Sequence, residues 1–196
     1  MSVSARLPTH MSVAEFLAWN GPPGQKWQLV DGEPQAMSLA NRTHGSLQSE
    51  LAWVLTSHFR ATGRPCVAVT EPGFVPRALA ATNVRIPDLA VTCSRYESEE
   101  ATLSGPVLIV EILSPSNTAE TWTNIWACTS IPSVREILVL HTASIVADLL
   151  RRDADGNWPE VPVSIAAGDL VLDSIGLSVP LKSLYRTTRL AANPFK

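Results

Sequence analysis

Two apolar segments in the middle of the chain predict the central strands of a sheet. Residues 87–92 and 107–113 are rich in aliphatic side chains, which is typical of strands that are buried on both faces. Each segment also carries one acid, Asp88 in the first and Glu111 in the second. Because an ionised carboxylate is costly to bury without a cation, a partner charge or a proton, these two positions are where chemistry is expected.

The remaining pattern of apolar and polar positions predicts helices on both sides of this sheet. Apolar residues recur at helical spacing over one long segment, and capping residues mark the start of two shorter helices. An Asp-Gly dipeptide between two short apolar runs predicts a hairpin. The expected elements are helices at 13–19, 42–61 and 117–131, a hairpin at 27–37 and further strands at 66–70, 73–75, 137–140 and 145–150.

Length and pattern together predict one domain with an α/β fold. A chain of 196 residues can bury a sizeable core, and no linker-like tract divides it. The core is expected to span residues 12–185, with peripheral strands near its end. Residues 186–196 show no periodic pattern and are expected to form a loosely ordered tail.

Charge and composition narrow the classes of function. The net charge of −3 and the pI near 5.8 argue against a protein that coats nucleic acid, because such binding depends on many neutralised phosphates. An enzyme that acts on nucleic acid needs only a local basic cleft, and twelve of the fifteen basic residues are arginines, which suit phosphate.

The sequence gives two expectations about the surroundings of the protein. No apolar run approaches the roughly 20 residues that a spanning helix needs, and the N-terminus has no charged and apolar leader, so a cytoplasmic location with no membrane partner is expected. The three cysteines, Cys66, Cys93 and Cys128, are widely spaced and odd in number. They are expected to be reduced, packed thiols.

The two acids are more informative together than alone. An acid at the end of a strand is often a solvated terminus or one half of a salt bridge. Asp88 and Glu111 are 23 residues apart, and the polar, turn-like stretch between them suits a connection between adjacent strands. Adjacent strands would bring both carboxylates together, so the pair predicts a divalent-metal site.

Five short motifs stand in a fixed order along the chain. They are Trp27 to Pro34, Thr43-His44-Gly45, Ile86 to Leu89, Val110 to Ser116 and Ile131 to Glu136. In this order and spacing they resemble the Uma-type family, described as putative restriction endonucleases, within the PD-(D/E)xK nuclease superfamily. The resemblance runs from about residue 12 to 185 and implies a restriction-endonuclease-like fold, a mixed central sheet flanked by helices.

The resemblance implies a metal-dependent DNA endonuclease, a hydrolase of phosphodiester bonds. Asp88 and Glu111 would be the metal-binding acids, and the main-chain carbonyl of Ile112 would be a third ligand for Mg²⁺ or Mn²⁺. The metal would lower the pKa of a bound water and stabilise charge on the phosphate. DNA is the partner that the resemblance implies, and a homodimer is compatible with it.

The sequence departs from the family pattern in the cationic half of the site. The superfamily lysine two residues after the acid is Leu113 here. The alternative lysine on the following helix is Ile125, and the acid that normally precedes it by four residues is Thr121. The usual glutamate of the first strand is Gln28. No lysine therefore stands where the resemblance places one.

Other residues could supply positive charge or move a proton. Lys26 would share a strand face with Gln28 and is the first candidate, with Arg85 the second. His44 has a pKa near neutrality, so either it or Gln28 could orient water. Lys26 could instead be a solvated residue that enters the strand, and His44 a solvated or capping side chain. The retained acids and the missing lysine leave two classes of function. One is an active endonuclease, and the other is an inactive nuclease fold that serves as a binding or interaction module.

Overall fold

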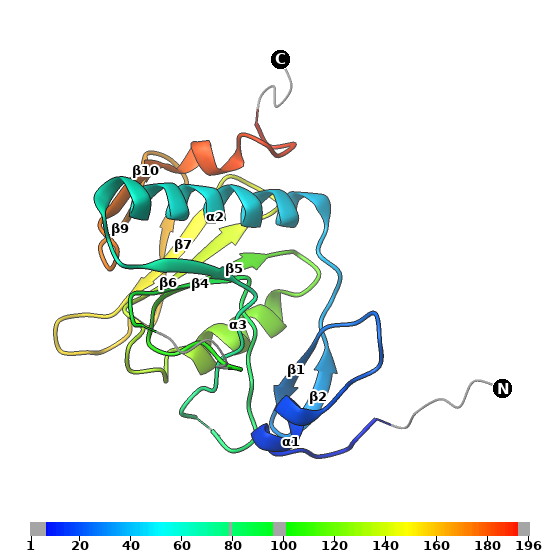
Figure 1. The fold of residues 1–196 in the computed structure, drawn as a ribbon. Coiled ribbons are helices and arrows are strands. Elements are labelled where there is room, and N and C mark those ends of the chain that lie inside the picture. The colour runs from blue at the N-terminus through cyan, green and yellow to red at the C-terminus, as the bar shows by residue number, and fades with distance from the viewer. Residues whose placement is uncertain (1–6, 79, 96–100, 192–196) are drawn as a thin grey trace.

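A six-stranded mixed sheet forms the centre of the molecule (Figure 1). The computed structural model describes residues 7–78, 80–95 and 101–191. The strand order is β3-β4-β5-β6-β7-β8, and β5 and β6 are parallel whereas all other neighbours are antiparallel. The strands are β3 (Val67–Thr70), β4 (Leu89–Thr92), β5 (Pro106–Leu113), β6 (Glu136–His141), β7 (Ala147–Arg151) and β8 (Val163–Ile165).

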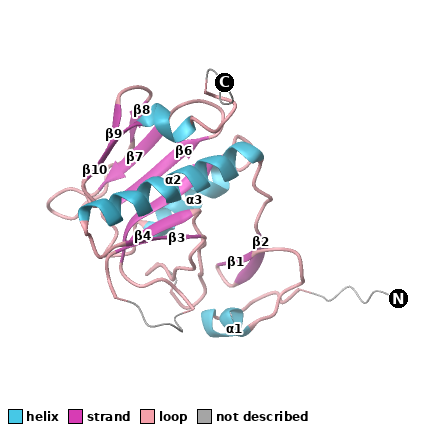
Figure 2. Cartoon of the chain, turned by 45° about the horizontal axis from the view of Figure 1, so that its top comes forward, coloured by secondary structure: helices cyan, strands magenta, loops and turns pink. Residues whose placement is uncertain are grey.

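Two helices, α2 (Arg42–Thr62) and α3 (Thr118–Cys128), cover opposite faces of this sheet (Figure 2). Successive residues of β5 point to opposite faces, so Val110 packs in the cluster that contains α2 and Ile109 in the one that contains α3. The predicted α/β fold with helices on both sides is confirmed. Within the described part of the chain, no helix is both long enough and apolar enough to cross a membrane.

The long helix α2 has clear start and stop signals. The side chain of Asn41 accepts a hydrogen bond from the N–H of His44, which caps the first turn. Gly63 ends the helix with a φ of 65°, a left-handed conformation that glycine adopts without steric cost. One face of the helix is apolar and buried, which fixes its rotation against the sheet. Its buried apolar residues are Leu47, Leu51, Leu55 and Phe59.

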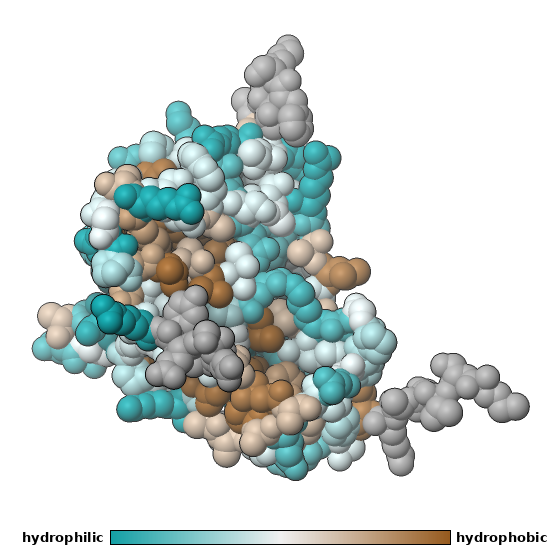
Figure 3. Space-filling view, in the orientation of Figure 1, coloured by the Kyte–Doolittle hydropathy of each residue, from teal (hydrophilic) through white to brown (hydrophobic). Residues whose placement is uncertain are grey.

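A hairpin, β1 (Trp27–Val30) and β2 (Glu33–Ala36), lies beside the main sheet together with α1 (Val13–Ala18). Asp31 and Gly32 both have positive φ values, 51° and 87°, as a two-residue hairpin turn of this sequence requires. Leu29 pairs with Val84 and packs in a small separate core with residues of α1. Figure 3 shows hydrophobic residues gathered at this end of the molecule.

The C-terminal part adds a second hairpin and returns to α2. It consists of β9 (Asp169–Leu172), β10 (Leu177–Pro180) and the 3₁₀ helix η1 (Leu181–Tyr185). The segment that was expected to be a loose tail is described as far as residue 191, and in it Thr188 is buried and bonds the carbonyl of Tyr185. Residues 192–196 lie outside the described part.

Two predicted elements differ in extent from the sequence pattern. The predicted strand at 73–75 is only an isolated bridge, in which Phe74 exchanges backbone hydrogen bonds with Arg85. The third helix ends at Cys128 rather than just before Pro132, because the chain continues in turns from Thr129.

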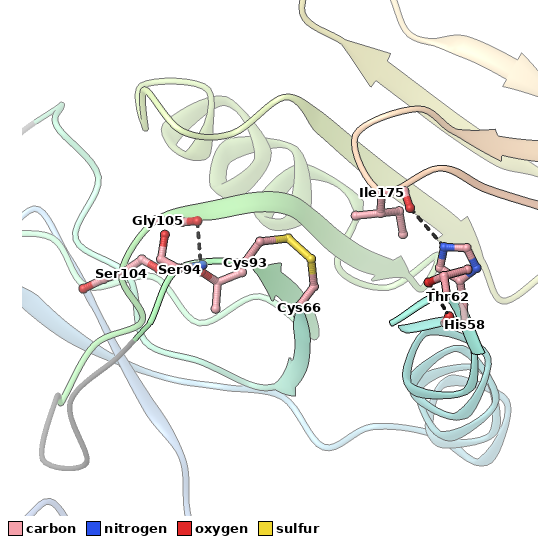
Figure 4. Close-up of a disulfide and its surroundings, with 9 residues drawn as sticks. His58, Thr62, Cys66, Cys93, Ser94, Ser104, Gly105 and Ile175 are labelled. Atoms are coloured by element: carbon pink, nitrogen blue, oxygen red, sulfur yellow. Dashed lines mark hydrogen bonds between the residues drawn. A yellow bond between two sulfur atoms is a disulfide. The ribbon is translucent and has the colours of Figure 1, made fainter. Parts of the chain in front are cut away.

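A disulfide between Cys66 and Cys93 corrects the prediction that all three cysteines are reduced (Figure 4). The two residues flank β3 and β4, and the antiparallel pairing of Val67 with Thr92 places them opposite each other. Only the third cysteine, Cys128, is a free and buried thiol as predicted. Disulfides are rare in the reducing cytoplasm, so this bond is not what the expected cytoplasmic location would predict.

We expect replacement of both bonded cysteines by alanine to lower the free energy of unfolding by about 3 kcal/mol. The bond joins residues 27 positions apart, and loss of the cross-link restores the entropy of that loop to the unfolded chain. Urea denaturation of the parent and of the Cys66→Ala/Cys93→Ala variant measures the difference.

The thiol count provides the control for this prediction. Alkylation of the denatured, unreduced protein should modify one cysteine, Cys128, and intact mass should report a single adduct. Three adducts in the unreduced protein would contradict the disulfide.

Candidate functional site

A cavity of about 660 Å³ lies where the first hairpin, the start of α2, the beginning of β4 and the N-terminal half of α3 meet. It collects residues that are far apart in the sequence. Of the six side chains proposed from the sequence, five line it, as does Ile112, whereas Arg85 does not. The lining residues used below are Lys26, Gln28, His44, Asp88, Glu111 and Glu120.

Asp88 immediately precedes β4 and is held from several directions. Its Oδ1 lies 2.7 Å from Nε2 of His44, and its Oδ2 accepts a hydrogen bond of 2.6 Å from the N–H of Ile112. Its backbone carbonyl accepts from the side chain of Gln48 and from the N–H of Glu71. The carboxylate therefore has a fixed position at the edge of the cavity.

Glu111 is the buried acid of the site. It lies on β5, adjacent to β4 as expected, and only 7% of the residue is exposed. Burial raises the pKa of Glu111 well above its usual value, and repulsion from Asp88 and Glu120 and a side-chain hydrogen bond with Asp88 raise it further. The protonated form of Glu111 is therefore favoured more strongly than that of a solvated glutamate.

His44 occupies the first turn of α2, where Asn41 caps its N–H. The side chain is 12% exposed and faces Asp88 rather than solvent. Of the two alternatives that the sequence left open, the structure shows a histidine that contacts Asp88. This geometry fixes the imidazole beside the carboxylate, while a role in proton transfer stays a prediction.

A third acid of the site, Glu120, is not among the site residues predicted from the sequence. It lies in the first turn of α3, where an acid is expected simply as a helix-start residue. Its Oε1 accepts a hydrogen bond of 3.1 Å from Gln28, which is buried. The available signal was its position one residue before Thr121, where the family pattern has an acid.

A buried chain of hydrogen bonds continues from Gln28 to the interior. The amide of Gln28 accepts from Asn124, and the Oδ1 of Asn124 accepts a hydrogen bond of 2.9 Å from Nη1 of Arg85. Burial lowers the pKa of Arg85, an effect that Asp31 and, to a smaller extent, Glu120 partly offset. Arg85 thus lies behind the cavity wall and reaches the acids only through two amides.

The place of the usual lysine is apolar. Leu113 shares the strand face of Glu111, as predicted, and packs with Ile109 in the core under α3 instead of lining the cavity. Among the described residues that line the cavity, Lys26 is the only lysine or arginine, and it forms an ion pair with Glu71. The first candidate cation is therefore present at the rim, although it is already paired.

The donor set fits Mg²⁺ or Mn²⁺ better than zinc. Asp88 and Glu111 offer carboxylate oxygens, and the carbonyl of Ile112 projects to the same edge of β5 as the N–H that bonds Asp88. No group of three or more His, Cys, Asp or Glu side chains with metal-binding geometry occurs among residues 7–78, 80–95 and 101–191. Mg²⁺ needs only one or two carboxylates because it keeps several waters.

Comparisons with other proteins agree with this fold. The crystal structure of a putative nuclease belonging to DUF820 from Anabaena variabilis superposes on this chain with a TM-score of 0.72. The two are 19% identical, and the match covers 89% of this chain and 97% of the other. At this identity the likeness shows the fold alone, and it supports the predicted restriction-endonuclease-like architecture. No match was found among curated proteins.

The family follows from the sequence match. Residues 13–181 match the Uma2 family, described as putative restriction endonuclease, and this range includes every residue of the acid site. Since the match spans most of the 196 residues, the chain belongs to the Uma2 family of putative restriction endonucleases.

Proposed function

We propose that the protein is a metal-dependent endonuclease that hydrolyses phosphodiester bonds in DNA. The observation that carries this proposal is the placement of Glu111, a buried carboxylate, beside Asp88 in the wall of a cavity. Within the described residues, the only basic group that the structure pairs with either acid is the imidazole of His44. Such an arrangement is costly unless a cation or a proton compensates it.

The acids and the adjacent carbonyl would hold the metal. Asp88, Glu111 and the carbonyl of Ile112 supply hard oxygen ligands at one edge of the sheet. When bound, Mg²⁺ or Mn²⁺ would lower the pKa of a coordinated water and stabilise the negative charge of the phosphate. Hydrogen bonds to both oxygens of Asp88 hold that ligand in place, which reduces the reorganisation that binding requires.

Other side chains in the wall would bind and orient the reactants. His44 directs Nε2 at Asp88, and Gln28 is held by Glu120, so both are positioned to orient a water at the acid pair. The ammonium of Lys26 lies at the rim, where exchange of Glu71 for a phosphate would let it bind the substrate. Family membership supports DNA as that substrate.

An inactive binding or interaction module is the second candidate function. The observation that favours it is Leu113, which puts an apolar side chain in the core where the superfamily has a catalytic lysine. On this alternative the fold and its acids would remain while cleavage is lost. We favour the nuclease because the two acids still line a cavity large enough for a substrate group.

Cleavage assays should distinguish these two functions. We expect Glu111→Gln and Asp88→Asn each to lower the rate of Mg²⁺-dependent DNA cleavage by at least about 100-fold, because each removes a ligand charge. The assay measures the conversion of supercoiled plasmid with Mg²⁺, with Mn²⁺ and with EDTA.

The matched control for the cleavage assay is Glu160→Gln, which makes the same change at an exposed position outside the cavity and should keep the parent rate. No cleavage by the parent with either metal would favour the binding module. A parent rate that EDTA does not change would refute the metal site.

Metal should also stabilise the folded protein, and only when Glu111 is present. At a Mg²⁺ concentration about 100 times its Kd, the parent should gain about 2.7 kcal/mol and its Tm should rise by several degrees. Glu111→Gln should lose this shift yet melt no lower than the metal-free parent, since it removes a repulsive buried charge. A variant that melts far below the metal-free parent would instead identify Glu111 as a structural ion-pair partner.

The raised pKa of Glu111 predicts a dependence of stability on pH. Between the ordinary value of 4.5 and the raised pKa, the folded protein keeps a proton that the unfolded chain has lost. The free energy of unfolding of the metal-free parent should therefore fall as the pH rises through this window, and the stabilisation is complete only below 4.5. Urea denaturation in EDTA at several pH values should show a shallower fall for Glu111→Gln, and identical slopes would contradict the assignment.

A further inference from the structure

A second hollow, of about 690 Å³, lies against the solvent-facing side of α2. Its residues recur every three or four positions, so they share one side of the helix. His44 and Gln48, which contact Asp88, belong to a different side of the same helix. The residues that matter here are Arg42, Ser46, Ser49, Glu50 and Trp53 of α2, and Arg186 after η1.

Trp53 is exposed and yet held in place. Its relative exposure is 58%, and the guanidinium carbon of Arg186 lies 4.9 Å from the centre of its ring. Arg186 is itself fixed by Glu50, with 2.6 Å between Nη2 and Oε1, and the Glu50 side chain is only 8% exposed. Single exposed aromatic residues are common on protein surfaces. Trp53 differs because Arg186, which contacts its ring, is itself held by the buried Glu50.

The charges around the two hollows differ in sign. Four acids line the cavity, against one lysine. The second hollow is lined by two arginines and one glutamate, with serine hydroxyls between them. A polyanionic substrate whose scissile phosphate enters the cavity would need positive charge nearby, and this surface supplies it.

The two hollows are neighbours at the start of α2. Ala40 and His44 line the cavity, and Arg42 and Gly45 line the second hollow. A strand that leaves the cavity past the first turn of the helix would therefore reach Arg42 first and Trp53 about three turns later.

We propose that this surface, Arg42 to Trp53 with Arg186, binds an unpaired segment of the nucleic-acid substrate. A base would stack on the Trp53 ring, and Arg42 and the serine hydroxyls would bind backbone phosphates. Unpaired bases are selected because both faces of a base in a duplex are already stacked, whereas a flexible strand can turn a base onto the ring. This inference rests on the proposed function, since it assigns the form of the same substrate.

Binding of a labelled oligonucleotide in EDTA tests the proposal separately from cleavage. Fluorescence anisotropy would compare a 12-nucleotide single strand with a duplex of the same length. We expect the parent to bind the single strand more tightly, and Trp53→Ala to weaken this binding by about 10-fold, as expected for the loss of one stacked base. Trp53→Phe should keep most of the affinity because it retains an aromatic face.

Trp126→Ala is the matched control. Trp126 is also a half-exposed tryptophan on a helix, at 43% exposure, but it lies on α3 outside both hollows. Its removal should leave the binding of the single strand unchanged, and circular dichroism verifies that each variant is folded. An equal loss in Trp53→Ala and Trp126→Ala, an unchanged affinity in Trp53→Ala, or tighter binding of the duplex would each overturn the proposal.

The outcomes separate this proposal from the proposed nuclease function. Trp53-dependent binding without any metal-dependent cleavage would support the binding surface and reject the nuclease. Cleavage that depends on Glu111, with no effect of Trp53→Ala on binding, would do the reverse.

Discussion

The burial of the Glu111 carboxylate beside Asp88 is the constraint on which the site depends. β5 is covered on both faces, so a charged side chain on this strand has no route to bulk water except through the cavity. The surrounding wall is arranged around this acid: an imidazole and a backbone N–H hold Asp88, and two amides separate Glu120 from a buried guanidinium. The wall holds the acids in place through hydrogen bonds, as the proposed metal site would require.

The positive charge of this protein is distributed differently from the superfamily pattern. The interior position next to Glu111 is apolar, Arg85 is displaced behind Asn124, and Lys26 is paired at the rim. Basic side chains that would usually contact the phosphate directly therefore lie farther from the two acids. A site of this kind would depend more on the metal for charge neutralisation, because fixed cations contribute less.

The sequence predicted the parts of the site that depend on strands and on local capping. Adjacent apolar strands explain why Asp88 and Glu111 could be paired in advance, and helix capping explains the placement of His44. Contacts between distant segments could not be read in the same way. Glu120 meets Gln28 across 92 positions, and only the folded position of the first hairpin brings them together. The Cys66–Cys93 bond was missed for a related reason, because it depends on a strand register that spacing alone does not specify.

The same disulfide makes a closed covalent ring of residues 66–93. Glu71, Arg85 and Asp88 all lie inside this ring, so one of the two acids proposed to bind the metal is on a loop of chain with no free end. A single peptide-bond break between the two cysteines would leave the fragments joined through sulfur, and the flanking strands β3 and β4 would stay attached. The acid would then remain tethered to the sheet after a proteolytic nick, and only reduction would separate the pieces.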